Sequence, residues 1–250
     1  MKNNTGKITI YTIVITAIVV TIIFFIRESL NKEANNKEIT VTNQAQAKTQ
    51  EEDKTETPEQ ELKNYEIYPD DIILGNHDAP VTIIEYASLS CPHCASFYNE
   101  SFDKLKSEYI DKGKVKFVYR DFPLNQPALA ASVVALCQYN SDKDIENYHS
   151  LIKSLFKSQD SWAFSEDFIQ KLEAIINLKG MSSEKFKQCI SDSSLQEQIL
   201  KARIKAAEEV QIKSTPTFII NNHVTYGYRS WDRTKSIIDH NLSDTKENNS

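Results

Sequence analysis

The stretch IIEYASLSCPHC, residues 83–94, places two of the chain's four cysteines in a C-x-x-C motif, directly after an apolar run with the composition of a β-strand. Pro92 suits the first turn of a helix, because its ring fixes φ and it has no N–H group to leave unpaired. A C-x-x-C motif between a strand and a helix is typical of cysteine pairs that exchange thiols for a disulfide. The stretch therefore predicts a redox-active pair formed by Cys91 and Cys94.

Two other interpretations of this pair stay open on the residues alone. Free cysteines often pack as small apolar side chains, so Cys91 and Cys94 could be buried thiols without a chemical role. They could also form half of a zinc site, which needs two further ligands at metal-like spacing. The other cysteines, Cys137 and Cys189, lie far apart, and neither has a second cysteine or histidine at ligand spacing. We therefore favour the redox interpretation and expect no metal.

The start of a helix also favours a thiolate at Cys91. Unpaired N–H groups and the positive end of the helix dipole stabilise negative charge there. His93 is expected to add a hydrogen bond or a positive charge. A stabilised thiolate is a good leaving group, so the Cys91–Cys94 disulfide should be passed on easily and the pair should be oxidising.

Residues 1–26 predict a membrane anchor. No charged residue occurs from Ile8 to Ile26, and a helix needs about 20 apolar residues to cross the hydrocarbon core of a bilayer. Lys2 and Lys7 precede this run, which favours an N-terminus in the cytoplasm. A cleaved signal peptide is the alternative, but its apolar region is shorter, about 7–15 residues, and it ends in a small-x-small site. Either way, the rest of the chain is expected on the periplasmic side of the cytoplasmic membrane, anchored there or, after cleavage, soluble.

Residues 27–66 are polar and contain almost no large apolar side chains. Such a composition cannot bury enough surface to offset the cost of ordering, so we expect a flexible linker. The whole chain has a net charge of −6, and no basic stripe that would bind nucleic acid is present in its sequence. Residues 67–250 remain as one domain, long enough for a substantial core.

The body of the chain alternates between strand and helix patterns. Residues 81–87 form an apolar run, residues 98–109 place large apolar side chains on one helical face, and residues 115–119 alternate as strands do. From about 124 to 210 the pattern is mainly helical. The segment TPTFIINNHVTYGY, residues 215–228, predicts a hairpin. The expected fold class is α/β, with a helical block interrupting a small sheet.

These motifs, with LGNHDAPVT at 74–82 and STPTFII at 214–220, resemble the DsbA-like thiol:disulfide oxidoreductases of the thioredoxin superfamily, in particular their membrane-anchored or secreted members. The resemblance covers residues 67 to about 240, and it is specific because separate motifs occur in the right order. It implies a thioredoxin fold with an inserted helical domain at about 124–210, preceded by the transmembrane helix and the linker.

The resemblance also implies a role for each matching residue. Cys91 would be the exposed, attacking sulfur and Cys94 its buried partner. Pro216 would be a cis-proline facing the pair, and the backbone of Thr215 would pair with a bound peptide. Glu85 matches the buried acid that many relatives use to move protons at the second cysteine. Because an acid is costly to bury within an apolar strand, a solvent-facing edge position is the alternative for Glu85.

Three further positions are judged against the family. Ser214 stands where glycine is usual, and His149 is interpreted as a structural residue. Thr215 is found in oxidases and in isomerases or reductases alike, so it does not decide the direction of disulfide transfer.

Some relatives carry a second disulfide within the helical domain, and an even cysteine count in an oxidising compartment suggests a bond. The resemblance therefore predicts a structural disulfide between Cys137 and Cys189.

The expected function is the introduction of disulfide bonds into exported proteins, with no cofactor beyond the Cys91–Cys94 pair. Its substrates would be unfolded or reduced exported proteins, and a quinone-coupled membrane oxidase would reoxidise it. A disulfide isomerase or reductase on the same fold is the alternative. A metal-binding C-x-x-C module is less favoured.

Overall fold

The computed structural model describes residues 60–61, 66–221 and 223–247. The predicted anchor, residues 1–26, and most of the predicted linker lie outside these residues. Among the helices that the structure does describe, none is both long and apolar enough to span a membrane.

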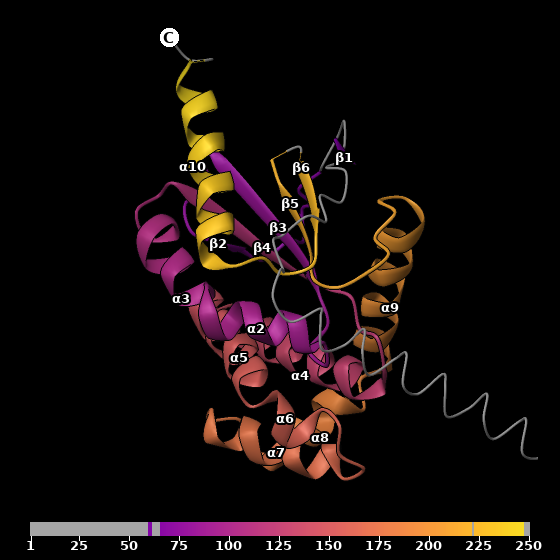
Figure 1. Ribbon diagram of the computed structural model, residues 1–250. Helices are drawn as coiled ribbons and strands as arrows, with labels where there is room; N and C mark the ends of the chain where they lie inside the picture. The colour runs from indigo at the N-terminus through magenta and orange to yellow at the C-terminus, as the bar shows by residue number, and fades with distance from the viewer. Residues whose placement is uncertain (1–59, 62–65, 222, 248–250) are drawn as a thin grey trace, which may run out of the picture. The chain divides into compact units, whose positions relative to one another are not determined.

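A six-stranded sheet forms the centre of the described chain, in the order β1-β6-β5-β3-β4-β2 (Figure 1). Strands β3 and β4 run parallel, as expected for the two strands of a βαβ unit, and every other neighbouring pair is antiparallel. The strands are β1 (Gln60–Glu61), β2 (Ile73–Leu74), β3 (Val81–Ala87), β4 (Val115–Asp121), β5 (Thr217–Ile220) and β6 (His223–Tyr226).

The position of β1 corrects one expected boundary. Residues 60–61 fall inside the segment predicted as a flexible linker, but they pair with Val224 and His223 of β6. A short polar segment can be ordered in this way because the edge of a sheet offers unpaired N–H and C=O groups whatever the side chains are.

Alternating side chains of β3 face the two sides of the sheet. Ile83 belongs to the larger core, which the helices α2 (Pro92–Glu100) and α10 (Trp231–Glu247) help to close. Ile84 belongs to a smaller core on the other side, where Ala206 of the helix α9 (Ser193–Glu208) packs. All seven residues of β3 are buried, so the strand that leads to the cysteines is held from both sides.

The helix expected over residues 98–109 is divided. The helix α2 ends at Glu100, and α3 (Phe102–Leu105) continues into a π-helical segment, η1 (Lys106–Ile110). The break falls at Ser101, which is fully buried and whose hydroxyl lies 2.8 Å from the Tyr228 hydroxyl. Helical backbone bonds continue on both sides of this break, because the Ser101 N–H donates to the Phe97 carbonyl and the Leu105 N–H donates to the Ser101 carbonyl, each at 2.9 Å.

The predicted helical insertion contains six helices. Figure 1 shows α4 to α8 grouped beyond one end of the sheet, with α6, α7 and α8 farthest from it. Asn125, Asp144 and Asp192 cap α4, α5 and α9 by accepting backbone N–H bonds, as short polar side chains do at N-caps. The remaining bounds are α4 (Gln126–Asp142), α5 (Ile145–Lys157), α6 (Gln159–Trp162), α7 (Phe168–Leu178) and α8 (Ser183–Ile190).

A disulfide joins two helices of this insertion. Cys137 of α4 and Cys189 of α8 are bonded with an S–S distance of 2.10 Å, across a sequence separation of 52. This is the pairing that the resemblance predicted.

Candidate active site

The Cys91–Cys94 pair lies where β3 passes into α2. Cys91 is the N-cap residue of α2, with extended backbone angles, and Pro92 occupies the first turn. The turn before it closes through a bond from the Cys91 N–H to the Ser88 carbonyl, 2.9 Å. Both cysteines are free thiols, and the helix start provides the environment in which a thiolate is stabilised.

Gln159, at the start of α6, holds this turn from the helical insertion. Its buried side-chain amide donates to the Leu89 carbonyl at 2.9 Å and to the Cys91 carbonyl at 3.0 Å. Two bonds from one planar amide fix the path of the backbone into the motif. Gln159 is not predictable from the sequence, because a lone glutamine in a helical segment carries no signal for a contact so distant along the chain.

The pKa values of the two thiols are shifted in opposite directions. The pKa of Cys91 is lowered to about 5, first by a hydrogen bond from the Cys94 thiol, and also by Thr215 and by the backbone N–H groups of Cys94 and His93. Burial raises the pKa of Cys94 well above its usual value, and the bond that it donates to Cys91 adds to this. Cys91 is 5% exposed and Cys94 is 0% exposed. Cys91 is therefore the thiolate that a partner can reach.

His93 contributes to the thiolate in a different way from the one expected. Its side chain lies exposed, and its backbone N–H, rather than its imidazole, is among the leading groups that lower the Cys91 pKa. This is the ordinary contribution of a first-turn amide at a helix N-terminus.

Thr215 and Pro216 face Cys91 from the loop before β5, and the peptide bond between them is cis. The Cys91 thiol donates to the Thr215 carbonyl, with a sulfur–oxygen distance of 3.3 Å. The Thr215 hydroxyl is buried and has no hydrogen-bond partner among the described residues. It can thus donate to Cys91 once that sulfur has lost its proton, which agrees with its lowering of the Cys91 pKa.

Glu85 lies in the middle of the sheet, so the solvent-facing edge alternative is wrong. Its strand β3 has β5 on one side and β4 on the other, and the residue is 0% exposed. Burial raises the pKa of the carboxyl well above its ordinary value, the Tyr98 hydroxyl lowers it, and the Cys91 charge raises it. Within the described chain, neither carboxyl oxygen has a partner at ordinary hydrogen-bond geometry. The Glu85 carboxyl therefore favours its protonated form and is poorly satisfied, and a negative charge on it raises the Cys94 pKa.

We expect Glu85→Leu to stabilise the reduced protein by about 1–3 kcal/mol at pH 8, since it removes a poorly satisfied buried polar group. A carboxyl whose pKa is raised on folding contributes stability at low pH and loses it as pH rises above the unfolded value, near 4.5. Wild-type stability should therefore fall between pH 5 and pH 8 more than that of the variant. Urea unfolding at both pH values measures this. Glu85→Gln is the control, because it should lose the pH dependence but gain less stability than Glu85→Leu, since a buried polar amide remains. A Glu85→Leu variant less stable than wild type at pH 8 would contradict this expectation.

His149 is 2% exposed, and its ring packs 5.9 Å from that of Phe117. Burial lowers the pKa of His149 to about 4, so the ring is neutral near pH 7. This environment agrees with the structural interpretation.

Three comparisons with known proteins, two of sequence and one of structure, show which family this chain resembles. Residues 68–240 match the family model described as Thioredoxin. A Rickettsia felis protein, named as a protein-disulfide oxidoreductase, is 31% identical over 231 residues, which are 88% of this chain and 81% of that protein.

Solved structures show the same fold. The crystal structure of Wolbachia pipientis alpha-DsbA1 superposes with a TM-score of 0.66 at 30% identity, over 74% of this chain and 96% of that one. BdbD from Bacillus subtilis, in its oxidised form, gives a TM-score of 0.64 at 22% identity, over 73% and 98% of the two chains. The chain belongs to the thioredoxin family and is a DsbA-like thiol:disulfide oxidoreductase.

Proposed function

We propose that Cys91 and Cys94 are the redox centre through which this oxidoreductase introduces disulfide bonds into exported proteins. The observation that carries the proposal is the difference between the two thiols: the pKa of Cys91 is about 5, and that of Cys94 is raised. A strongly stabilised Cys91 thiolate favours the reduced pair, and a pair that favours reduction gives its disulfide away. No cofactor besides this pair is required.

The exchange proceeds in two balanced steps. A substrate thiolate attacks the Cys91 sulfur, the Cys91–Cys94 bond breaks, and Cys94 leaves as a thiolate that takes the proton of the Glu85 carboxyl. A second substrate thiolate then attacks the substrate sulfur of the mixed disulfide, and Cys91 leaves as its stabilised thiolate. The substrate loses two electrons, which the cysteine pair gains.

The substrate would bind along the loop before β5. Thr215 and cis-Pro216 lie beside the Cys91 sulfur. An extended peptide can pair with the backbone at such a position by strand addition, which gives affinity without requiring a particular sequence. That suits a donor that acts on many unfolded or reduced proteins.

The N-terminal residues would place this activity at the membrane. We propose that residues 1–26 anchor the chain, that a flexible linker follows, and that the domain lies on the periplasmic side. The anchor would keep the domain close to a quinone-coupled membrane oxidase that reoxidises it, since tethering raises effective concentration. Replacing residues 1–26 with a cleavable signal peptide should release the domain from the membrane and increase the reduced fraction of the Cys91–Cys94 pair in cells. An unchanged redox state would count against this role of the anchor.

The redox equilibrium of the pair with glutathione tests the direction of transfer. A Cys91 pKa of about 5 lies between the values of about 7 for thioredoxin and about 3.5 for DsbA. We therefore expect a potential between about −180 mV, as in protein disulfide isomerase, and about −120 mV, as in DsbA. A value near −270 mV, as in thioredoxin, would make the protein a reductase.

A further inference from the structure

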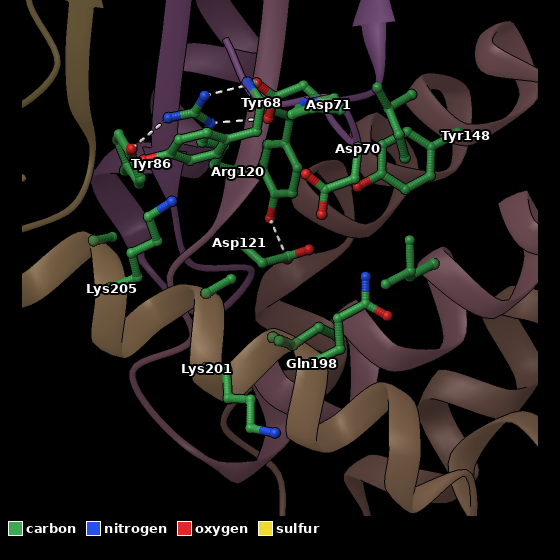
Figure 2. Close-up of a pocket in the computed structure, with 17 residues that line it drawn as sticks. Tyr68, Asp70, Asp71, Tyr86, Arg120, Asp121, Tyr148, Gln198, Lys201 and Lys205 are labelled. Carbon is green, nitrogen blue, oxygen red and sulfur yellow. Dashed lines mark hydrogen bonds and ion pairs between the residues drawn. The ribbon is translucent and has the colours of Figure 1, made fainter. Parts of the chain in front are cut away.

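A cavity of about 410 Å³ lies between the end of β4, the helix α9 and the segment 68–72 (Figure 2). None of the residues that line it belongs to the cysteine turn or to the 215–216 loop. Asp70 is exposed and the Lys201 side chain is 73% exposed, so the cavity opens to solvent. The substrate site therefore does not account for this cavity.

Asp121, the last residue of β4, lies among the lining side chains, between Tyr148 on one side and Gln198 and Lys201 of α9 on the other (Figure 2). Its carboxylate accepts hydrogen bonds from the Ser132 hydroxyl and, at 3.1 Å, from the Tyr119 hydroxyl. Burial raises the pKa of Asp121 to about 6. This carboxyl can therefore take up and release protons close to neutral pH.

The strand pairing brings this carboxyl to the side of the sheet on which Glu85 lies. In the parallel pair of β3 and β4, Glu85 is the partner of Tyr119, and Ala87 is the partner of Asp121. Side chains of partner residues on adjacent strands point to the same face. Tyr119 is thus the strand neighbour of Glu85 on this face, and its hydroxyl is bonded to Asp121, which lines the cavity.

Two further buried phenols lie around this link. Tyr98, whose hydroxyl interacts with Glu85, stacks on Phe156 with ring centroids 4.3 Å apart. The Tyr119 ring lies 6.3 Å from Phe156 and 6.5 Å from Tyr148. Tyr98, Tyr148, Glu85 and Asp121 all act electrostatically on Tyr119. Buried phenols and rings therefore surround the space between Glu85 and Asp121, and among the described residues the hydrogen bond within this group is the one from Tyr119 to Asp121.

We propose that Tyr119 and Asp121 are positioning residues of a proton route that connects Glu85, and through it Cys94, with the solvent of this cavity. The inference rests on the exchange proposed for Cys91 and Cys94. When Cys94 leaves as a thiolate, Glu85 gives it a proton and becomes a buried carboxylate. A proton then passes from solvent to Asp121 and on to the Tyr119 hydroxyl. No hydrogen bond joins that hydroxyl to Glu85 among the described residues, so the last transfer requires a bridging water or a turn of the Glu85 side chain toward Tyr119. During reoxidation the same proton travels outward, so no proton is gained or lost over the cycle.

The other charged groups that face Asp121 are held by partners of their own. Arg120 forms an ion pair with Asp71 at 2.6 Å, Lys201 forms one with Glu197 at 2.7 Å, and the Lys205 ammonium lies 3.9 Å from the centre of the Tyr68 ring. The remaining titratable side chains that line the cavity are Asp70 and the phenols of Tyr86, Tyr119 and Tyr148. The groups that bond directly to the Asp121 carboxylate are the two hydroxyls of Ser132 and Tyr119.

Rapid-mixing kinetics of the reduced, full-length protein with glutathione disulfide test the route. The first step, attack by Cys91, forms a mixed disulfide, and the second, attack by Cys94, requires the Cys94 proton to leave. A general acid or base contributes about 10²–10⁴-fold to a rate. Glu85 keeps that role in the variants, so loss of Asp121, the solvent end of the route, should slow the second step by less than this. We expect Asp121→Asn to slow the second step by about tenfold and to remove its inflection near pH 6, while the first step stays unchanged.

Asp70→Asn is the matched control, because Asp70 lines the same cavity but is exposed. It should leave both steps unchanged. Tyr119→Phe removes only the connecting hydroxyl and should slow the second step as Asp121→Asn does, and it carries the test alone if Asp121→Asn fails to fold.

A second step with wild-type rate and pH profile in both variants would overturn the route. Asparagine can still accept both hydroxyl bonds, so a merely structural Asp121 would give that result. Failure of wild-type Cys91 to form the mixed disulfide would instead contradict the proposed function.

Discussion

Cys91→Ser is expected to reduce catalysed disulfide exchange to the uncatalysed rate, whereas Cys94→Ser should keep the first step and trap its product. Cys91 has the stabilised thiolate and the exposed edge, and Cys94 is fully buried with a raised pKa, so Cys94 cannot replace it. Without Cys94, a mixed disulfide between Cys91 and a partner lacks the internal thiol that would resolve it. Non-reducing electrophoresis should show these adducts, and a reductant should remove them.

The double variant Cys91→Ser/Cys94→Ser is the control for this experiment. It keeps the Cys137–Cys189 disulfide, so any adduct that still forms would come from reshuffling of that bond. Adducts in Cys91→Ser and none in Cys94→Ser would mean that the two sulfurs have the opposite roles. That result would also contradict the assignment of the lowered pKa to Cys91.

Local sequence patterns predicted the parts of the site that depend on neighbouring residues. The apolar run before the motif became β3, and the proline after Cys91 stands in the first turn of α2. Both follow from preferences that act over a few residues, the packing of apolar side chains in a strand and the fixed φ of proline. The cis-Pro216 loop, by contrast, was placed opposite the cysteines only by resemblance, since no local preference brings residues 91 and 215 together.

The parts that were missed depend on contacts across the chain. Gln159 bonds to the Leu89 carbonyl from 70 positions away, and Asp121 meets Ser132 only because α4 folds back over the end of β4. Polar residues such as these are common on exposed helix faces and strand ends, so their identity does not reveal a buried partner. The burial of Glu85 stayed open for the same reason. An acid within a strand is compatible with a solvent-facing edge position and also with a buried position where it has a chemical role.

Removing the Cys137–Cys189 bond is expected to have the largest effect on stability. The bond closes a loop over a sequence separation of 52, and for a loop of that length the chain-entropy model gives about 4 kcal/mol of stabilisation. Cys137→Ala/Cys189→Ala should therefore lower the free energy of unfolding by about 4 kcal/mol relative to the oxidised protein. Urea unfolding followed by circular dichroism measures the change.

Gln138→Ala/Gln188→Ala is a matched control, since these residues adjoin the two cysteines on the same helices but are not buried. Surface changes of this kind usually alter stability by less than about 0.5 kcal/mol.

The helix α8 packs on α4 and α7, whereas the cysteine turn is held by Gln159 of α6. The alanine pair should therefore keep the redox potential of Cys91 and Cys94 while it loses stability. A loss below about 1 kcal/mol would contradict this prediction, because the chain-entropy contribution of the bond would then be largely absent and packing would hold α4 and α8 together. A shifted redox potential would instead show that the bond supports the cysteine turn through the helical insertion.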